Sequence, residues 1–181
     1  MNNIAIDFNP LIYGSRAVRR CTACLVNEIL KHNANNYNLL CFGNKGNIIN
    51  NFEKLIHSSK KKVVPIPYRF LVPFWKIFSW PRIETIIPNC DIFYTNEFYF
   101  PPTKKALVLA TIHGLAYKVI PEKISSQLVE TLNKGLFYIL KHADYLISVS
   151  ETTKKELITH VGVPRDRIYV VTHGVDKKFR K

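Results

Sequence analysis

Residues that could do chemistry stand at the ends of apolar runs in this sequence. His113 comes directly after the run 106–112 and is followed by Gly114. A histidine in that position can donate a hydrogen bond to a ligand hydroxyl or shuttle a proton, although spacing alone favours a structural role in which it caps its own loop. Similar polar residues follow three other runs: Asn96 and Glu97 after 91–95, Ser150 and Glu151 after 145–149, and His173 after 167–171. Taken together, these residues predict a ligand site where the runs end. For any single one of them, an ordinary place in a polar surface loop is an alternative.

A second candidate site precedes the first helical pattern of the chain. Gly14, Ser15 and Arg16 lead into it, and Arg20 lies one turn further on. Backbone N–H groups at a helix N-terminus, with arginines nearby, favour an anion such as a phosphate. The glycine-rich dinucleotide fingerprint is missing, so an ordinary turn with solvated arginines is an equal alternative.

The cysteines argue against a metal site. Cys21 and Cys24 form a C-x-x-C pattern, which occurs in redox pairs and in half of some zinc sites. The sequence has no second such pair and no histidine pair at zinc-finger spacing. We therefore expect two small residues packing on one helix face, reduced thiols throughout, and no metal or cofactor.

The segment 60–82 mixes aromatic and cationic side chains. A membrane interface suits that mixture, because the rings lie at headgroup level and the cations meet lipid phosphates. Stacking on single-stranded nucleic acid and packing of a short helix on the protein core are the alternatives. The candidate membrane or lipid-acceptor face consists of Arg69, Phe74, Trp75, Lys76 and Trp80.

Short apolar runs alternate with amphipathic stretches along the chain. We expect strands at 4–8, 37–42, 62–66, 91–95, 106–112, 145–149 and 167–171, and helices at 16–32, 50–57, 121–142 and 150–161. This order predicts an α/β, Rossmann-like, doubly wound and mainly parallel sheet of about seven strands, with helices on both faces. In such a sheet, ligands bind beyond the carboxyl ends of the strands, where the polar residues above are expected. One domain should span 1–176, with 177–181 beginning a linker.

Composition limits the classes of protein and of partner. The 181 residues are 47% apolar and 22% charged, which excludes an intrinsically disordered chain. Twenty-six Lys and Arg against 13 Asp and Glu give a net charge of +13, which predicts an anionic partner without choosing one. The N-terminus does not have the pattern of a signal peptide, and no apolar run reaches the roughly 18 residues of a spanning helix. We expect a cytoplasmic protein, with a peripheral position on the inner face of the membrane left open.

Three stretches together resemble a known family. They read Thr-Ile-His-Gly-Leu at 111–115, Asp-Tyr-Leu-Ile-Ser-Val-Ser-Glu at 144–151, and Gly-Val-Pro-Arg-Asp-Arg-Ile-Tyr-Val-Val-Thr-His-Gly-Val-Asp at 162–176. In this order and spacing they are similar to the N-terminal half of retaining GT-B glycosyltransferases of glycosyltransferase family 4. The resemblance covers most of the chain and is strongest from Asp91 onward.

The resemblance implies roles for the candidate residues. In these enzymes two Rossmann-like domains face each other across a cleft, the N-terminal one mainly holding the acceptor and the C-terminal one the nucleotide sugar. His113 would then meet the donor sugar near the reacting centre, and the loop 14–16 with Arg20 would approach its diphosphate. Asn96 and Glu97 would line the acceptor side, while Ser150, Glu151 and His173 would border the cleft. The family needs no metal, because cationic side chains and helix ends neutralise the leaving diphosphate.

The sequence also departs from the family pattern. The family often reads Gly-Ile-Gly-Arg-Tyr-Thr at the first helix, whereas residues 17–22 read Ala-Val-Arg-Arg-Cys-Thr, so only Arg20 and Thr22 match. Gly114 stands where the family usually has aspartate after the key histidine. Residues 174–176 lie where the family crosses to its second domain, so we expect the C-terminal donor domain to lie outside this sequence.

The resulting hypothesis is the acceptor-side half of a glycosyltransferase, inactive alone. The complete enzyme would move a sugar from a nucleotide sugar to a glycan or lipid-linked acceptor in surface polysaccharide synthesis, with an anionic membrane surface as a further partner. A basic nucleic-acid-binding module is one alternative, supported by the charge but by no recognisable nucleic-acid-binding motif. A standalone Rossmann-like nucleotide-binding domain is the other.

Overall fold

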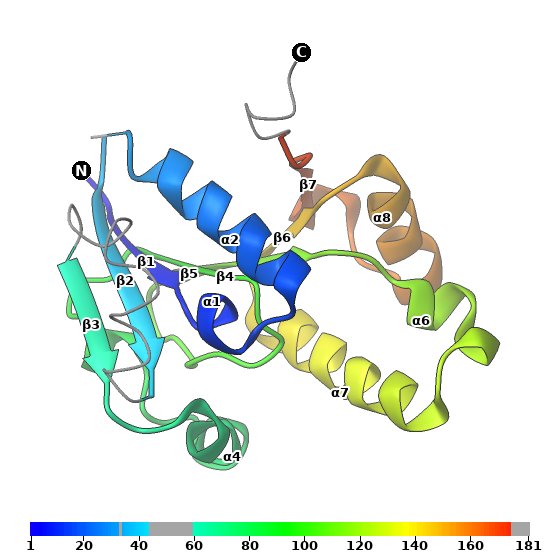
Figure 1. The fold of residues 1–181 in the computed structure, drawn as a ribbon, viewed down its shortest axis with the longest axis horizontal. Helices are drawn as coiled ribbons and strands as arrows, with labels where there is room; N and C mark the ends of the chain where they lie inside the picture. The colour runs from blue at the N-terminus through cyan, green and yellow to red at the C-terminus, as the bar shows by residue number, and fades with distance from the viewer. Residues whose placement is uncertain (33, 44–59, 175–181) are drawn as a thin grey trace. The chain divides into compact units, whose positions relative to one another are not determined.

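The computed structural model describes residues 1–32, 34–43 and 60–174 of the chain (Figure 1). The helix expected at 50–57 and the linker expected at 177–181 lie outside these residues. The chain divides into two compact units, Met1–Val108 (unit 1) and Leu109–Lys181 (unit 2). The single domain expected over 1–176 stays a prediction.

The strands form a seven-stranded sheet in the order β3-β2-β1-β4-β5-β6-β7. Strand β1 runs parallel to β2 and to β4, and β2 runs parallel to β3. In unit 2, β6 runs parallel to β5 and to β7. The strands are β1 (Asn3–Asp7), β2 (Asn36–Phe42), β3 (Lys60–Val64), β4 (Ile92–Thr95), β5 (Leu107–Ile112), β6 (Tyr145–Ser148) and β7 (Ile168–Val170). This architecture confirms the α/β, Rossmann-like fold class.

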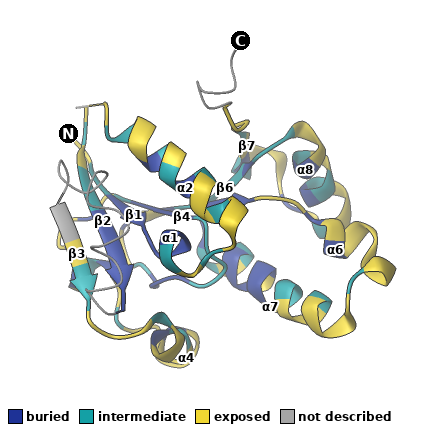
Figure 2. Ribbon diagram, viewed as in Figure 1, coloured by how far each residue is buried: buried dark blue, intermediate teal, exposed yellow. Residues whose placement is uncertain are grey.

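Unit 1 contains the helices α1 (Pro10–Tyr13), α2 (Arg16–Ile29), α4 (Tyr68–Phe78) and α5 (Ile83–Ile86). Helix α2 begins at the expected residue because the Ser15 hydroxyl accepts a hydrogen bond from the Val18 backbone N–H at 3.4 Å. It ends three residues earlier than expected. Strand β3 begins and ends two residues before its expected bounds, since Pro65 and Pro67 cannot continue a hydrogen-bonded ladder. The core of unit 1 includes the buried side chains of Phe8, Phe42, Phe93 and Phe100 (Figure 2).

Unit 2 contains α6 (Ala116–Val119), η1 (Pro121–Lys123), α7 (Ser126–His142), α8 (Glu151–Glu156), the π-helical turn η2 (Leu157–Val161) and η3 (Arg165–Arg167). The single helix expected over 121–142 is therefore wrong at its start, because Ile124 adopts an extended conformation that separates η1 from α7. The Ser150 hydroxyl accepts from the Thr153 N–H at 3.1 Å and caps α8, near the helix start expected at 150. Gly162 ends η2 in the left-handed region, at φ 77°.

No helix in the described part of the chain is long and apolar enough to cross a membrane.

Candidate functional site

A buried polar network occupies the carboxyl ends of β1 and β4 in unit 1. Asp7 is the last residue of β1 and is only 1% exposed. One carboxylate oxygen accepts hydrogen bonds from the backbone and side-chain nitrogens of Asn9, at 3.0 and 2.9 Å, and the other accepts from the Thr95 hydroxyl at 2.8 Å. Burial raises the pKa of Asp7 to about 6, because desolvation outweighs the effect of these donors.

Asn9 extends the network to the end of β2. Its side-chain oxygen accepts from the Phe42 backbone N–H at 2.9 Å and lies 3.7 Å from the Cys41 sulfur. The Tyr13 hydroxyl donates to the Phe42 carbonyl at 3.3 Å. Gly43 follows with φ 131°, and a Cβ there would lie 2.4 Å from the Tyr13 hydroxyl, so this turn requires glycine.

Glu97 and Asn96 lie just beyond the end of β4. The Glu97 backbone N–H donates to the Thr95 hydroxyl at 3.0 Å, which links Glu97 to the network around Asp7. Burial raises the pKa of Glu97 to about 8, and the Asp7 carboxylate adds to the rise. At neutral pH the Glu97 carboxyl group can therefore donate as well as accept a hydrogen bond.

Asn96 is already bonded within unit 1. Its oxygen accepts from the Tyr94 hydroxyl at 2.6 Å, and its amide nitrogen donates to the Thr22 hydroxyl at 3.1 Å. Thr22 is fully buried on α2. Asn96 therefore ties α2 to β4, and of the two predicted acceptor residues Glu97 has the side chain better placed for a ligand.

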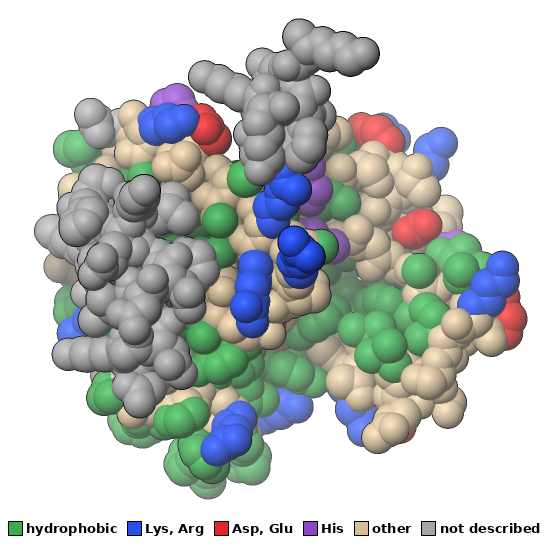
Figure 3. Space-filling model, in the orientation of Figure 1, with side chains coloured by type: hydrophobic (Ala, Val, Ile, Leu, Met, Phe, Trp, Pro, Cys, Tyr) green, Lys and Arg blue, Asp and Glu red, His purple; other side chains and the backbone are tan. Residues whose placement is uncertain are grey.

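The loop between α1 and α2 is held mainly by Arg19. Its guanidinium group donates to the carbonyls of Gly14 and Ile12, at 2.8 and 2.7 Å. A Cβ on Gly14 would lie 2.3 Å from the Pro10 carbonyl oxygen, so the close turn needs glycine. The other residues predicted here, Ser15, Arg16 and Arg20, are exposed. Figure 3 shows cationic side chains where α2 lies in Figure 1, and the anion site stays a prediction.

Unit 2 places two histidines together beyond its strand ends. His113 directly follows β5 and His173 lies three residues after β7. Their rings stack with centroids 5.7 Å apart and an interplanar angle of 27°. Both residues are solvent-exposed. Partial desolvation lowers the pKa of His113, and the nearby His173 adds a smaller effect in the same direction. The lower pKa favours a neutral imidazole at pH 7.

The other two predicted residues of unit 2, Ser150 and Glu151, lie at the start of α8. The Ser150 hydroxyl donates to the Thr153 hydroxyl at 3.0 Å as well as capping α8, and Glu151 is exposed in the first turn of that helix. Two nearby cations donate to backbone carbonyls. Lys154 donates to the Ile168 carbonyl at 2.8 Å, and Arg167 donates to the carbonyls of Asp144 and Ala143 at 3.1 and 2.5 Å. Part of the positive charge therefore holds β7 in place.

One further hollow in unit 2 contains none of the predicted residues. It measures about 560 Å³ and lies beside the start of α7. Its lining includes Ile124, Val129, Glu130 and Asn133.

The environment of Cys21 does not favour a reactive cysteine pair. All four cysteines are free thiols. Burial, followed by the neighbouring Cys24, raises the pKa of Cys21, which disfavours the reactive thiolate. The expectation of metal independence stays a prediction.

The predicted membrane face is wrong at one residue, Trp75. The prediction placed it with the exposed side chains, but it is 1% exposed, and its ring packs on Phe42 and Tyr68 at centroid distances of 5.2 and 5.6 Å. The reason is helical spacing, because Trp75 lies one turn after the buried Leu71. The other four members, Arg69, Phe74, Lys76 and Trp80, are exposed.

The sequence-based prediction missed the centre of the unit 1 network. Asp7, Asn9 and Thr95 were not candidates. One signal was available, since an aspartate that ends an otherwise apolar strand has to find partners when it is buried. The partner Thr95 is 88 residues away, and no local pattern shows that pairing.

Comparison with known proteins identifies the family. The model of Glycosyltransferase Family 4 matches residues 29–179. Among solved structures, a glycosyltransferase from Rickettsia africae ESF-5 is 18% identical with a TM-score of 0.56, and the match covers 97% of this chain and 44% of that one. No curated protein matches the chain. Because the family model covers most of the sequence, including both predicted rims beyond β4 and β5, the chain belongs to Glycosyltransferase Family 4.

Proposed function

We propose that this chain is the acceptor-side part of a retaining, GT-B glycosyltransferase. The enzyme would transfer a sugar from a nucleotide-sugar donor to a glycan or lipid-linked acceptor in surface polysaccharide synthesis. Membership of the family supports sugar transfer in general. The chain spans 44% of the length of the Rickettsia glycosyltransferase, which supports a role as one part of a larger enzyme.

The observation that carries the acceptor role is the position of Glu97. It follows a strand whose end is fixed by the buried hydrogen bond between Asp7 and Thr95, and its own backbone N–H donates to Thr95, so its backbone is held in place. Sugars present hydroxyl groups that both donate and accept, and a carboxyl group with a pKa near the working pH can serve either need. We therefore assign Glu97 to an acceptor hydroxyl, with Asn96 supporting the local backbone.

The donor roles are assigned by resemblance and by position. In unit 2, His113 would contact the transferred sugar as a neutral imidazole, and His173, Ser150 and Glu151 would border the ligand. In unit 1, Gly14, Ser15, Arg16 and Arg20 would approach the diphosphate. Their charges would offset the negative charge that develops on the leaving group, which is the reason for expecting no metal.

The acceptor role is tested by isothermal titration of the 181-residue chain. The probe is a short-chain polyprenyl-phosphate-linked sugar in detergent micelles, and a nucleoside diphosphate is titrated separately. Glu97→Ala should weaken binding of the lipid-linked sugar about tenfold, the effect of losing one hydrogen bond to a polar ligand. Failure of the unaltered chain to bind the sugar would contradict the role, and tighter binding of the nucleotide would favour a nucleotide-binding module.

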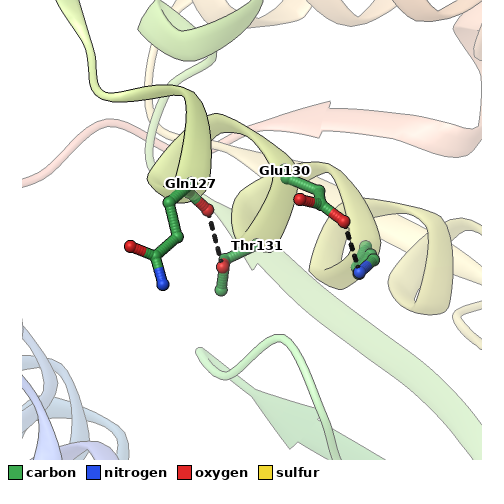
Figure 4. A network of polar contacts seen from close by, with 4 residues as sticks. Gln127, Glu130 and Thr131 are labelled. Atoms are coloured by element: carbon green, nitrogen blue, oxygen red, sulfur yellow. Dashed lines mark hydrogen bonds and ion pairs between the residues drawn. The ribbon is translucent and has the colours of Figure 1, made fainter.

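The matched control is Glu130→Ala on α7. Glu130 is exposed and pairs with Lys134 at 2.6 Å, beside the hydrogen bond from the Thr131 hydroxyl to the Gln127 carbonyl (Figure 4). It also lines the hollow beside α7. This variant should bind like the unaltered chain. A selective loss in Glu130→Ala would instead place the acceptor at that hollow and overturn the assignment of Glu97.

Sugar transfer is tested directly with the same chain. Incubated with nucleotide sugars and lipid-linked acceptors, the chain alone should transfer no sugar. Efficient transfer by the isolated chain would contradict the proposal that it is one part of the enzyme.

A further inference from the structure

Helix α4 is apolar on two neighbouring sides, one buried and one exposed. One side faces the core of unit 1, where Leu71 and Trp75 are 4% and 1% exposed. Tyr68 strengthens this contact, because its hydroxyl donates to the Tyr99 carbonyl while its ring packs on Trp75. The inner side therefore fixes the orientation of the helix.

The outer side of α4 is aromatic and uncovered among the described residues. The exposed fractions are 54% for Phe70, 49% for Phe74, 71% for Ile77, 66% for Phe78 and 58% for Trp80. The first four follow helical spacing, and the rings of Phe74 and Phe78 lie 5.8 Å apart. Figure 2 shows most of this helix as exposed. A contiguous apolar patch of this kind is rare on a solvated surface and marks a docking site. We call these five residues the α4 face.

Within the described part of the sequence, the stretch that contains α4 carries only positive charge. Residues 60–83 contain six Lys and Arg and no Asp or Glu. Arg69 lies 4.9 Å from the Phe70 ring centroid, and the Lys76 amine lies 3.9 Å from that of Tyr99, so both cations stand beside aromatic rings. Figure 3 shows cationic side chains beside hydrophobic ones at the position of α4.

We propose that the α4 face docks on the surface of an anionic lipid bilayer. Aromatic and aliphatic side chains enter the boundary between headgroups and acyl chains, and the surrounding cations meet lipid phosphates. Charge complementarity decides between occupants. In a symmetric dimer through this face, cations would face cations. A nucleic acid would match the charge, but the aliphatic Ile77 is the most exposed member of the face and suits acyl chains better than base stacking. The inference concerns membrane attachment and does not depend on sugar transfer.

The two tryptophans allow a direct test. Trp75→Phe leaves Trp80 as the only tryptophan, on the α4 face, whereas Trp80→Phe leaves the buried Trp75. On adding vesicles of phosphatidylcholine with one-third phosphatidylglycerol, the emission of Trp80 should shift to shorter wavelength and be quenched by brominated lipid. The emission of Trp75 should not change. No shift of Trp80, or equal shifts of both tryptophans, would overturn the proposal. Should Trp75→Phe not fold, the difference between the unaltered chain and Trp80→Phe gives the same signal.

Vesicle flotation tests which side chains carry the binding. The double variant Ile77→Ser with Phe78→Ser should reduce the bound fraction at least tenfold. Phe137→Ser is the matched control, because Phe137 is 70% exposed on α7 and lies outside the α4 face. It should change binding less than twofold. Equal losses in the two variants would contradict a specific face.

A third experiment tests how much the cations beside the α4 face contribute to the binding of anionic vesicles. Arg69→Gln with Lys76→Gln should weaken binding severalfold and reduce its dependence on salt, while Lys118→Gln with Lys155→Gln in unit 2 should not. Binding to pure phosphatidylcholine should be much weaker for every form. Equally strong binding to neutral vesicles would overturn the anionic specificity. A dimer in sedimentation equilibrium that Ile77→Ser abolishes, without vesicle binding, would identify a second copy as the occupant.

Discussion

The strand ends of unit 1 and those of unit 2 organise their polar residues in different ways. In unit 1 the carboxylate of Asp7 is buried and accepts three hydrogen bonds from its own unit. In unit 2 the imidazoles of His113 and His173 stack at the surface with both side chains exposed. Buried polar groups that bind one another fix the backbone, whereas exposed ones can meet a ligand at little structural cost. The predictions below test that contrast.

The largest difference should appear in stability. Asp7→Ala removes the acceptor of Asn9 and Thr95 and leaves buried donors without a partner, so the free energy of unfolding should fall by about 3 kcal/mol. His113→Ala should change it by less than about 0.5 kcal/mol, because the side chain is exposed. Urea unfolding of both variants measures the difference. Equal effects would break the comparison.

The second largest effect should be a pH dependence of the free energy of unfolding, which comes from Glu97 in unit 1. The pKa of Glu97 is raised to about 8, so between about pH 4.5 and 8 the folded chain holds a proton that the unfolded chain has lost. Glu97 therefore stabilises the fold at low pH, and the free energy of unfolding should fall by a few kcal/mol as the pH rises through this window, since one pKa unit corresponds to about 1.4 kcal/mol.

Glu97→Gln isolates this contribution. The variant should lose the part of the pH dependence that lies between pH 6 and 8, as measured by urea unfolding at each pH. Glu130→Gln, at an exposed carboxylate, should keep the dependence of the unaltered chain. An unchanged profile in Glu97→Gln would show that Glu97 ionises normally.

A smaller effect is expected at the loop between α1 and α2. Arg19→Ala removes the two hydrogen bonds to the carbonyls of Gly14 and Ile12 and should lower the unfolding free energy by about 1 kcal/mol. Arg16→Ala, at an exposed position of the same helix, should lower it by less than about 0.5 kcal/mol. Thermal unfolding of the two variants decides which arginine holds the loop, and a reversed order would contradict the account.

The smallest effect concerns the histidine pair. His173→Ala removes the neighbour that helps to lower the pKa of His113, so that pKa should move up toward its ordinary value without reaching it, because desolvation remains. An NMR titration of the His113 ring measures the change. His160→Ala, at an exposed position on η2, serves as the control. A downward shift, or equal shifts in both variants, would show that His173 is not the relevant neighbour.

Local patterns predicted the framework well. The strand–helix alternation predicted the seven strands. The helix starts expected near 16 and 150 agree with the structure, where the side chains of Ser15 and Ser150 accept capping hydrogen bonds. These features depend on residues a few positions apart, so the sequence carries them directly. The polar residues after β4, β5, β6 and β7 could be placed at strand ends for the same reason.

Features that depend on distant residues could not be predicted. The bond between Thr95 and Asp7 joins positions 88 apart. Which side of α4 is buried depends on the contact of Trp75 with Phe42, which lies on the distant strand β2. The separation between η1 and α7 follows from the extended backbone at Ile124, where an apolar residue gave no sign of a break. Tertiary contacts decided the first two cases.

The central claim is that the end of β4 in unit 1 receives the acceptor. NMR chemical-shift mapping tests it most directly, with the chain titrated by a short-chain polyprenyl-phosphate-linked sugar. The account predicts that the largest amide shifts occur at Asn96 and Glu97, and that Glu97→Ala reduces them while Glu130→Ala does not. Shifts confined to the start of α7, or none in either unit, would contradict it.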